Sequence, residues 1–152
     1  MKRFLFILSF VILLYACSNE EAILLEDLST HGDLPNQLNE QGTFIVMSTD
    51  QGIYKIPVEN ISLTIDNIGN SPVGFGAAHY LEKFQEGKWR KIPYENFAFT
   101  DEGLGVEVGE TFEQTVPLDH IGYGLTEGRY RIVKEFLLNP ENKTIASEFE
   151  IQ

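Results

Sequence analysis

From residue 43 to the end of the chain, apolar and polar residues alternate with a period of two. The clearest case is Ile61, Leu63 and Ile65, which alternate with polar residues as in a strand that buries one face. No helical period of about 3.6 residues appears in this region. We therefore expect strands wherever β-branched and aromatic residues cluster. These segments are residues 43–48, 61–65, 79–84, 88–92, 112–118, 129–138 and 144–151.

Turn-forming residues separate the expected strands. Asn67–Pro72 and Asn139–Asn142 are rich in Asn and Pro, and Gln85–Gly87 predicts a hairpin between the strands on either side. Strands joined by short turns, with no helix between them, are typical of an antiparallel β-sandwich. We therefore predict one all-β domain of this type at residues 43–152.

A glycine and a tyrosine stand at the start of the longest expected strand. Immunoglobulin-like sandwiches place a tyrosine near the start of one central strand, with its hydroxyl bonded to backbone a few residues upstream. Gly128 and Tyr130 fit this corner. We expect Tyr130 to be buried with a bonded hydroxyl.

Several short motifs together carry a resemblance to a known family. They are Phe75-Gly76, Tyr80–Phe84, Gly87-Lys88-Trp89, Ile92-Pro93, Gly109–Thr111 and Gly128–Lys134. In this combination the chain resembles the bacterial Ig-like domain of small cell-envelope lipoproteins, over about residues 43–152. The resemblance implies an immunoglobulin-like sandwich and structural roles for Trp89, Gly128 and Tyr130. It supplies no catalytic residues.

The first 17 residues have the pattern of an export signal. Lys2 and Arg3 precede the apolar run Phe4–Leu14, which is too short to span a bilayer of about 30 Å but suits a signal peptide. The run leads into Leu14-Tyr15-Ala16-Cys17, which resembles the lipobox of bacterial lipoproteins. That resemblance implies cleavage between Ala16 and Cys17 and attachment of lipid to the Cys17 sulfur.

Residues 17–42 show no clear period, and we expect them to form a linker. A flexible tether of about 25 residues has an r.m.s. span of roughly 28 Å. The expected organisation is a signal peptide at 1–16, lipidated Cys17 and linker at 17–42, and the domain at 43–152. The expected location is the cell envelope, anchored by lipid to the outer face of the plasma membrane or to an outer membrane.

The net charge of the chain limits the classes of partner that it can bind, and its cysteine content limits the sites that it can form. The chain has a formal charge of −12, and removal of Lys2 and Arg3 with the signal peptide makes it −14. This excess of acid disfavours nucleic acid and favours an envelope protein with a neutral or basic surface. Cys17 is the only cysteine, so the chain forms no internal disulfide and no thiolate zinc site.

The sequence contains no GxSxG, HExxH, P-loop or dinucleotide-binding GxGxxG motif. His31, His79 and His120 stand far apart in sequence, and we expect no metal and no cofactor. Aromatic residues in expected loops are the remaining candidates for ligand contact, with Tyr94 and Tyr123 preferred. Phe97 and Phe99 alternate as an ordinary strand would.

Three functions remain open. The preferred one is a membrane-anchored, non-enzymatic binding domain. The alternatives are an inhibitor of an envelope protease, which a protruding rigid loop would favour, and a hydrolase with a dispersed site. A cleft with convergent carboxylates of shifted pKa would favour the hydrolase.

Overall fold

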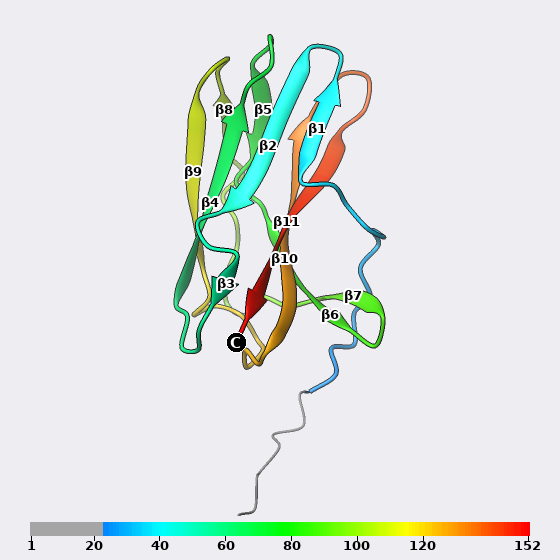
Figure 1. Cartoon of the computed structure of the whole chain (residues 1–152), viewed down its shortest axis with the longest axis vertical. Coiled ribbons are helices and arrows are strands. Elements are labelled where there is room, and N and C mark those ends of the chain that lie inside the picture. Colours follow the sequence, from blue (N-terminus) through cyan, green and yellow to red (C-terminus); the bar gives the residue numbers. More distant parts are fainter. Residues whose placement is uncertain (1–22) are drawn as a thin grey trace, which may run out of the picture.

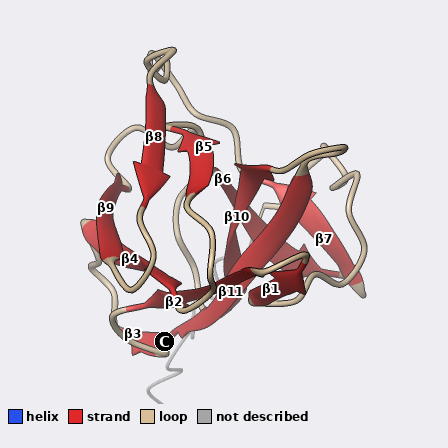
Figure 2. Cartoon of the chain, turned by 90° about the horizontal axis from the view of Figure 1, so that it is seen from above, coloured by secondary structure: helices blue, strands red, loops and turns tan. Residues whose placement is uncertain are grey.

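The computed structural model describes residues 23–152, which form two β-sheets packed face to face (Figures 1 and 2). Its elements are all strands. They are β1 Gln37–Glu40, β2 Thr43–Thr49, β3 Ile53–Tyr54, β4 Asn60–Asn67, β5 Val73–Gly76, β6 Tyr80–Gln85, β7 Lys88–Lys91, β8 Gly103–Val106, β9 Thr111–Pro117, β10 Gly128–Leu137 and β11 Lys143–Ile151.

The smaller sheet has the strand order β1-β2-β4-β9, and the larger sheet has the order β3-β11-β10-β5-β8. Strand β6 also joins the larger sheet, because it pairs with both β10 and β7. Every pairing is antiparallel except that of β3 with β11. The predicted all-β, immunoglobulin-like sandwich is therefore confirmed.

Strand β10 organises the larger sheet because it changes partner along its length. Its first part pairs with β6, from Tyr130 opposite Lys83 to Val133 opposite Tyr80. Its end pairs with β5, where Phe136 lies opposite Phe75. The break between the two partners falls at residues 77–79, so the backbone carbonyls there need partners from elsewhere in the domain.

The core lies between the sheets and follows the period-two pattern. Ile61, Leu63 and Ile65 of β4 are fully buried. On the facing sheet, the Phe75 ring centroid lies 5.5 Å from that of Phe136 and 5.1 Å from that of Phe112. Edge-on aromatic contacts of this kind add to the free energy gained by burying the rings.

The domain begins earlier than residue 43. Residues 37–40, expected to be linker, form β1, in which Leu38 is buried opposite Ile45. Residues 23–36, named here the N-terminal strap, lie against β7. The Ser29 amide donates to the Trp89 carbonyl (2.9 Å), and the Lys91 amide donates to the Asp27 carbonyl (2.8 Å). The described part of the expected linker is therefore a structural part of the domain.

The expected signal peptide, Ala16 and Cys17 lie outside the described residues. Within residues 23–152, no helix is long and apolar enough to cross a membrane.

Candidate functional site

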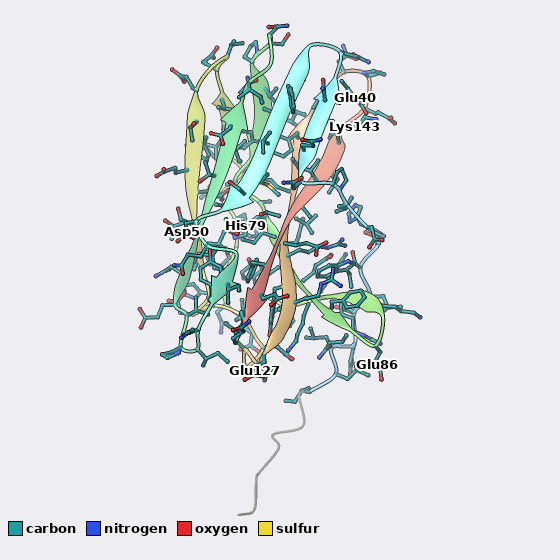
Figure 3. The ribbon with its side chains drawn as sticks, in the orientation of Figure 1. Glu40, Asp50, His79, Glu86, Glu127 and Lys143 are labelled. Carbon is teal, nitrogen blue, oxygen red and sulfur yellow. The ribbon has the colours of Figure 1, made fainter. Side chains whose placement is uncertain are left out.

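The two ends of the sandwich are built differently (Figure 1). At the N-terminal end, the described chain begins near the turn between β6 and β7, the C-terminus and strand β3. At the distal end, the turns at residues 41–42, 67–72, 107–110 and 139–142 come together. Figure 3 shows Glu127 at the N-terminal end, Glu40 and Lys143 at the distal end, and His79 between them.

The corner predicted at Tyr130 is present at the N-terminal end. The buried Tyr130 hydroxyl donates to the Thr126 carbonyl (2.6 Å) and accepts from the Thr126 amide (3.2 Å). Gly128 has a φ of 144°, and a Cβ there would lie 3.2 Å from Cε of Lys83. The Lys83 ammonium lies 5.0 Å from the centre of the Tyr130 ring. Gly128 thus gives the lysine side chain room to pass beneath the corner.

Tyr123, one of the two expected contact residues, is largely buried. Its hydroxyl accepts a hydrogen bond from Lys83 Nζ (3.2 Å). Its ring contributes to the wall of a groove of about 660 Å³ between the strap and residues 121–124. Lys91 and three carboxylates, Glu26, Asp27 and Glu95, also line this groove. Most of the Tyr123 ring therefore packs inside the protein. That Tyr123 contacts a ligand remains a prediction.

Tyr94, the other expected contact residue, belongs to an aromatic cluster in the loop between β7 and β8. Ring centroids of Tyr94, Phe97 and Phe99 lie 5.0–5.5 Å from one another. His79 approaches Phe99 at 4.7 Å, and His120 stacks on Phe97 at 5.2 Å. The expectation that Phe97 and Phe99 alternate in a strand is wrong, because residues 95–102 form no strand and their rings cover one another.

His79 is the most enclosed member of this cluster. Its Nδ1 lies 3.3 Å from the Ala77 carbonyl oxygen and 3.2 Å from Nε2 of Gln114. Its Nε2 and the Tyr94 hydroxyl are buried, and neither has a hydrogen-bond partner among the residues that the structure describes. Burial lowers the pKa of His79 to about 4 and raises that of Tyr94. His79 is therefore neutral at physiological pH.

Lys134 was missed by the sequence reasoning. It occupies an inward position of β10, between Ile132 and Phe136, and its side chain is fully buried. Its ammonium donates to the carbonyls of Gly76 (2.8 Å) and Ala78 (3.2 Å) and to Oε1 of Gln114 (3.0 Å). Burial lowers the pKa of Lys134 to about 8. Lys134 binds one carbonyl at the end of β5 and one within the break between β5 and β6, which is a structural role.

Trp89 packs over a buried ion pair on the outer face of the larger sheet. Arg131 Nε donates to Glu82 Oε2 (2.7 Å), and the guanidinium carbon lies 4.2 Å from the centre of the Trp89 ring. The strap supplies the remaining partners, because the Arg131 guanidinium donates to the carbonyls of Gly32 (2.8 Å) and His31 (3.2 Å). The strap therefore covers the ion pair of Arg131 with Glu82, which would be exposed to water on an uncovered sheet face.

Asn67 locks the distal loops together. Its fully buried side chain donates to the carbonyls of Ser71 (2.9 Å) and Val106 (3.1 Å) and accepts from the Gly69 amide (3.1 Å). A Cβ on Gly69 would lie 2.3 Å from the Phe44 amide nitrogen, so only glycine fits. The turns after β1, β4 and β8 are thereby held as one unit.

These locked loops present apolar side chains to solvent. Ile68 is 59% exposed and Val108 is 47% exposed. Residues 66–72 and 105–111 also carry Asp66, Glu107 and Glu110, and they contain no lysine or arginine. The distal end thus combines two apolar contact points with negative charge on a fixed backbone. Exposed, rigid loops at one end of a sandwich are a common binding surface.

The groove beside Tyr123 brings Lys91 and three carboxylates, Glu26, Asp27 and Glu95, to one surface. Within residues 23–152, no three His, Cys, Asp or Glu side chains are placed to hold a metal ion together. The strongly shifted pKa values of His79 and Lys134 belong to buried side chains in the core.

The comparisons with known proteins identify the fold type. A family model described as a bacterial Ig-like domain matches residues 41–150, which leaves the strap outside the match. A search of curated proteins gave no match. Among solved structures, the Pseudomonas fluorescens alkylpurine DNA glycosylase AlkC, bound to DNA containing an abasic site analog, is similar at 15% identity and a TM-score of 0.37. The similarity covers 73% of this chain and 30% of that one.

Proposed function

This chain belongs to the bacterial Ig-like domain family, and on that premise we propose that it is a lipid-anchored binding module of the cell envelope. Its distal loops are the contact surface for an envelope protein. Lipid on Cys17 holds the chain at a bacterial membrane, and no cofactor or catalytic step is involved.

The observation that carries this proposal is the locked distal end. The Asn67 hydrogen bonds fix the loops before any partner arrives. A surface that is already ordered loses less conformational entropy on binding than a mobile one. Ile68 and Val108 then supply apolar area at the end opposite the one where the described chain begins.

Charge defines the partner's chemistry. The loops at residues 66–72 and 105–111 carry Asp66, Glu107 and Glu110 and no lysine or arginine, and Lys143 at the same end is paired with Glu40 and Glu141. Complementary potentials speed encounter and disfavour wrong partners. The fitting partner is a protein surface with an apolar recess for Ile68 or Val108 and a neutral or basic rim. Inhibition of an envelope protease is a second candidate, favoured by the same rigid loops.

Site-specific photo-crosslinking in the native cell tests the proposal. A benzophenone amino acid replaces Val108 at the distal end or, as a matched control, Tyr80, which is 52% exposed on the larger sheet. We expect a discrete crosslinked protein from position 108 and none from position 80. The reverse pattern would contradict the distal surface. Recovery of a protease whose activity the crosslinked domain blocks would select the inhibitor function.

A further inference from the structure

The N-terminal end of the sandwich exposes apolar side chains that the core does not use. Ile53 and Ile56 flank Lys55 in and just after β3, and Ile56 is 48% exposed. Ile23 and Leu24 at the start of the strap are also exposed. These five residues form two groups, one at β3 and one at the start of the strap, and we name them together the basal patch. Figure 1 shows β3 and the start of the described chain at the same end.

The basal patch is firmly attached to the domain. The Ile56 amide donates to the Gln152 carbonyl (3.1 Å), which fixes the chain after β3 to the end of β11. The Ile23 carbonyl accepts from Gln85 Nε2 (3.1 Å), and the Leu25 amide donates to Gln85 Oε1 (3.0 Å). Both pieces are therefore fixed to the sandwich by hydrogen bonds.

The strap shortens the connection between lipid and domain. Only residues 18–22 stand between Cys17 and Ile23. Even fully extended, this chain spans at most about 20 Å, far less reach than a free linker up to residue 42 would have. A lipid on Cys17 therefore keeps the N-terminal end close to the headgroups, and this step rests on the lipid anchor of the proposed function.

We infer that the basal patch rests on the same bilayer that holds the lipid of Cys17. Isoleucine and leucine enter the boundary between headgroups and acyl chains, while a lysine extends its ammonium toward water. Anchoring supplies a high local concentration, so a contact made by a few side chains is sufficient. Glu26, Asp27 and Glu127 at this end disfavour anionic headgroups, so the contact is apolar rather than electrostatic.

This arrangement sets the orientation of the whole domain. Strand β10 runs from the N-terminal end toward the distal end (Figure 1). Ten residues of strand cover about 33 Å, so the distal loops stand roughly that far above the membrane. The two ends then have separate tasks, with the basal patch on lipid and the distal loops toward a partner.

Depth-dependent quenching tests the basal patch on a chemically anchored protein. The mature chain, residues 17–152, is coupled through Cys17, its only thiol, to a maleimide lipid in phosphatidylcholine vesicles that contain brominated acyl chains. Ile56→Trp reports on the patch. Val108→Trp is the matched control, because the two positions are 48% and 47% exposed. Trp89 is common to both variants.

We expect the brominated lipid to reduce the emission of Ile56→Trp by about twofold relative to ordinary lipid, and to leave Val108→Trp nearly unchanged. Equal quenching at both positions would mean that the domain tumbles on its tether, and absence of quenching at position 56 would mean that the patch stays in water. Either result overturns the inference. Because the coupling is chemical, neither result depends on whether the cell acylates Cys17.

Discussion

The side chain of His79 makes the stability of this domain sensitive to acid. Burial holds the pKa of His79 at about 4 in the folded protein, against 6.5 as its ordinary value. Between pH 6.5 and pH 4, His79 binds a proton in the unfolded chain but not in the folded chain. The stabilisation is therefore complete above pH 6.5 and is lost as the pH falls toward 4.

Replacement of His79 tests this linkage. Between pH 7 and pH 4.5, we expect wild type to lose about 2–3 kcal/mol more unfolding free energy than His79→Phe. The phenylalanine keeps a ring against Phe99 but cannot bind a proton. Urea unfolding at the two pH values measures the difference, and parallel losses in both proteins would show that His79 is not the acid-sensitive group.

The Tyr130 hydroxyl gives a second prediction at the scale of a single residue. Tyr130→Phe removes a donor to the Thr126 carbonyl, which keeps its bond from Lys83 Nζ (3.3 Å), and leaves the Thr126 amide without its partner. We expect a loss of about 1–3 kcal/mol in unfolding free energy. Tyr80→Phe is the control, since the Tyr80 side chain is half exposed, and it should change stability little. Equal effects from the two substitutions would count against the corner.

Sequence reasoning could locate Tyr130 but not Lys134 or Asn67, for a physical reason. The corner is a local arrangement, because its two partners are four residues apart. Lys134 and Asn67 are polar residues at buried positions. The partners of Lys134 and the Val106 partner of Asn67 lie far away in sequence. A pattern of apolar and polar residues predicts that such positions are exposed, because it contains no information about which backbone carbonyls the fold leaves unpaired.

Among the strands, the long one with clear alternation was predicted, whereas several short strands with few apolar residues were not. Strand β4 shows buried residues at every second position, and the sequence displays that period directly. Strands β5 and β8 each contain two glycines, and β1 is polar except for Leu38. Their neighbours hold them in place through hydrogen bonds, and a hydropathy pattern carries no trace of those bonds.

The strap gives a prediction at the scale of an element. A chain that begins at residue 36 loses the buried Leu25 side chain and uncovers the ion pair of Arg131 with Glu82. We expect its unfolding free energy to fall by about 2–4 kcal/mol relative to a chain that begins at residue 18. A chain that begins at residue 23 keeps the strap and serves as the control. Identical denaturation midpoints for the chains beginning at 18 and 36 would restore the linker interpretation.

At the scale of the whole molecule, the fold type followed from the sequence, whereas the domain boundary did not. Short turns and period-two segments are global features that a single sequence displays. The strap has no such period, because it is held by backbone bonds to β7 and by carbonyls that Arg131 binds. The difference matters for function, since only residues 18–22 then separate the domain from Cys17 in the sequence.

The binding function predicts that the whole chain lacks turnover. Purified residues 18–152 should hydrolyse none of a broad panel of ester, peptide, phosphate and glycoside substrates, with or without divalent metal ions. The physical reason is that His79 and Lys134, two of the side chains with strongly shifted pKa values, are buried inside the sandwich. Reproducible turnover that a single Asp, Glu or His substitution abolishes, with the fold intact, would establish the hydrolase instead.

The most direct test of the account is acylation of Cys17 in the cell, because both the location and the orientation proposed here depend on it. Cells expressing the wild-type chain or Cys17→Ser are fed an alkyne-bearing fatty acid, and the purified proteins are compared for label and for electrophoretic mobility. Since Cys17 is the only thiol in the chain, we predict label on a processed wild-type protein and an unlabelled precursor for Cys17→Ser. Equal labelling of the two proteins, or an unlabelled wild type, would contradict the account.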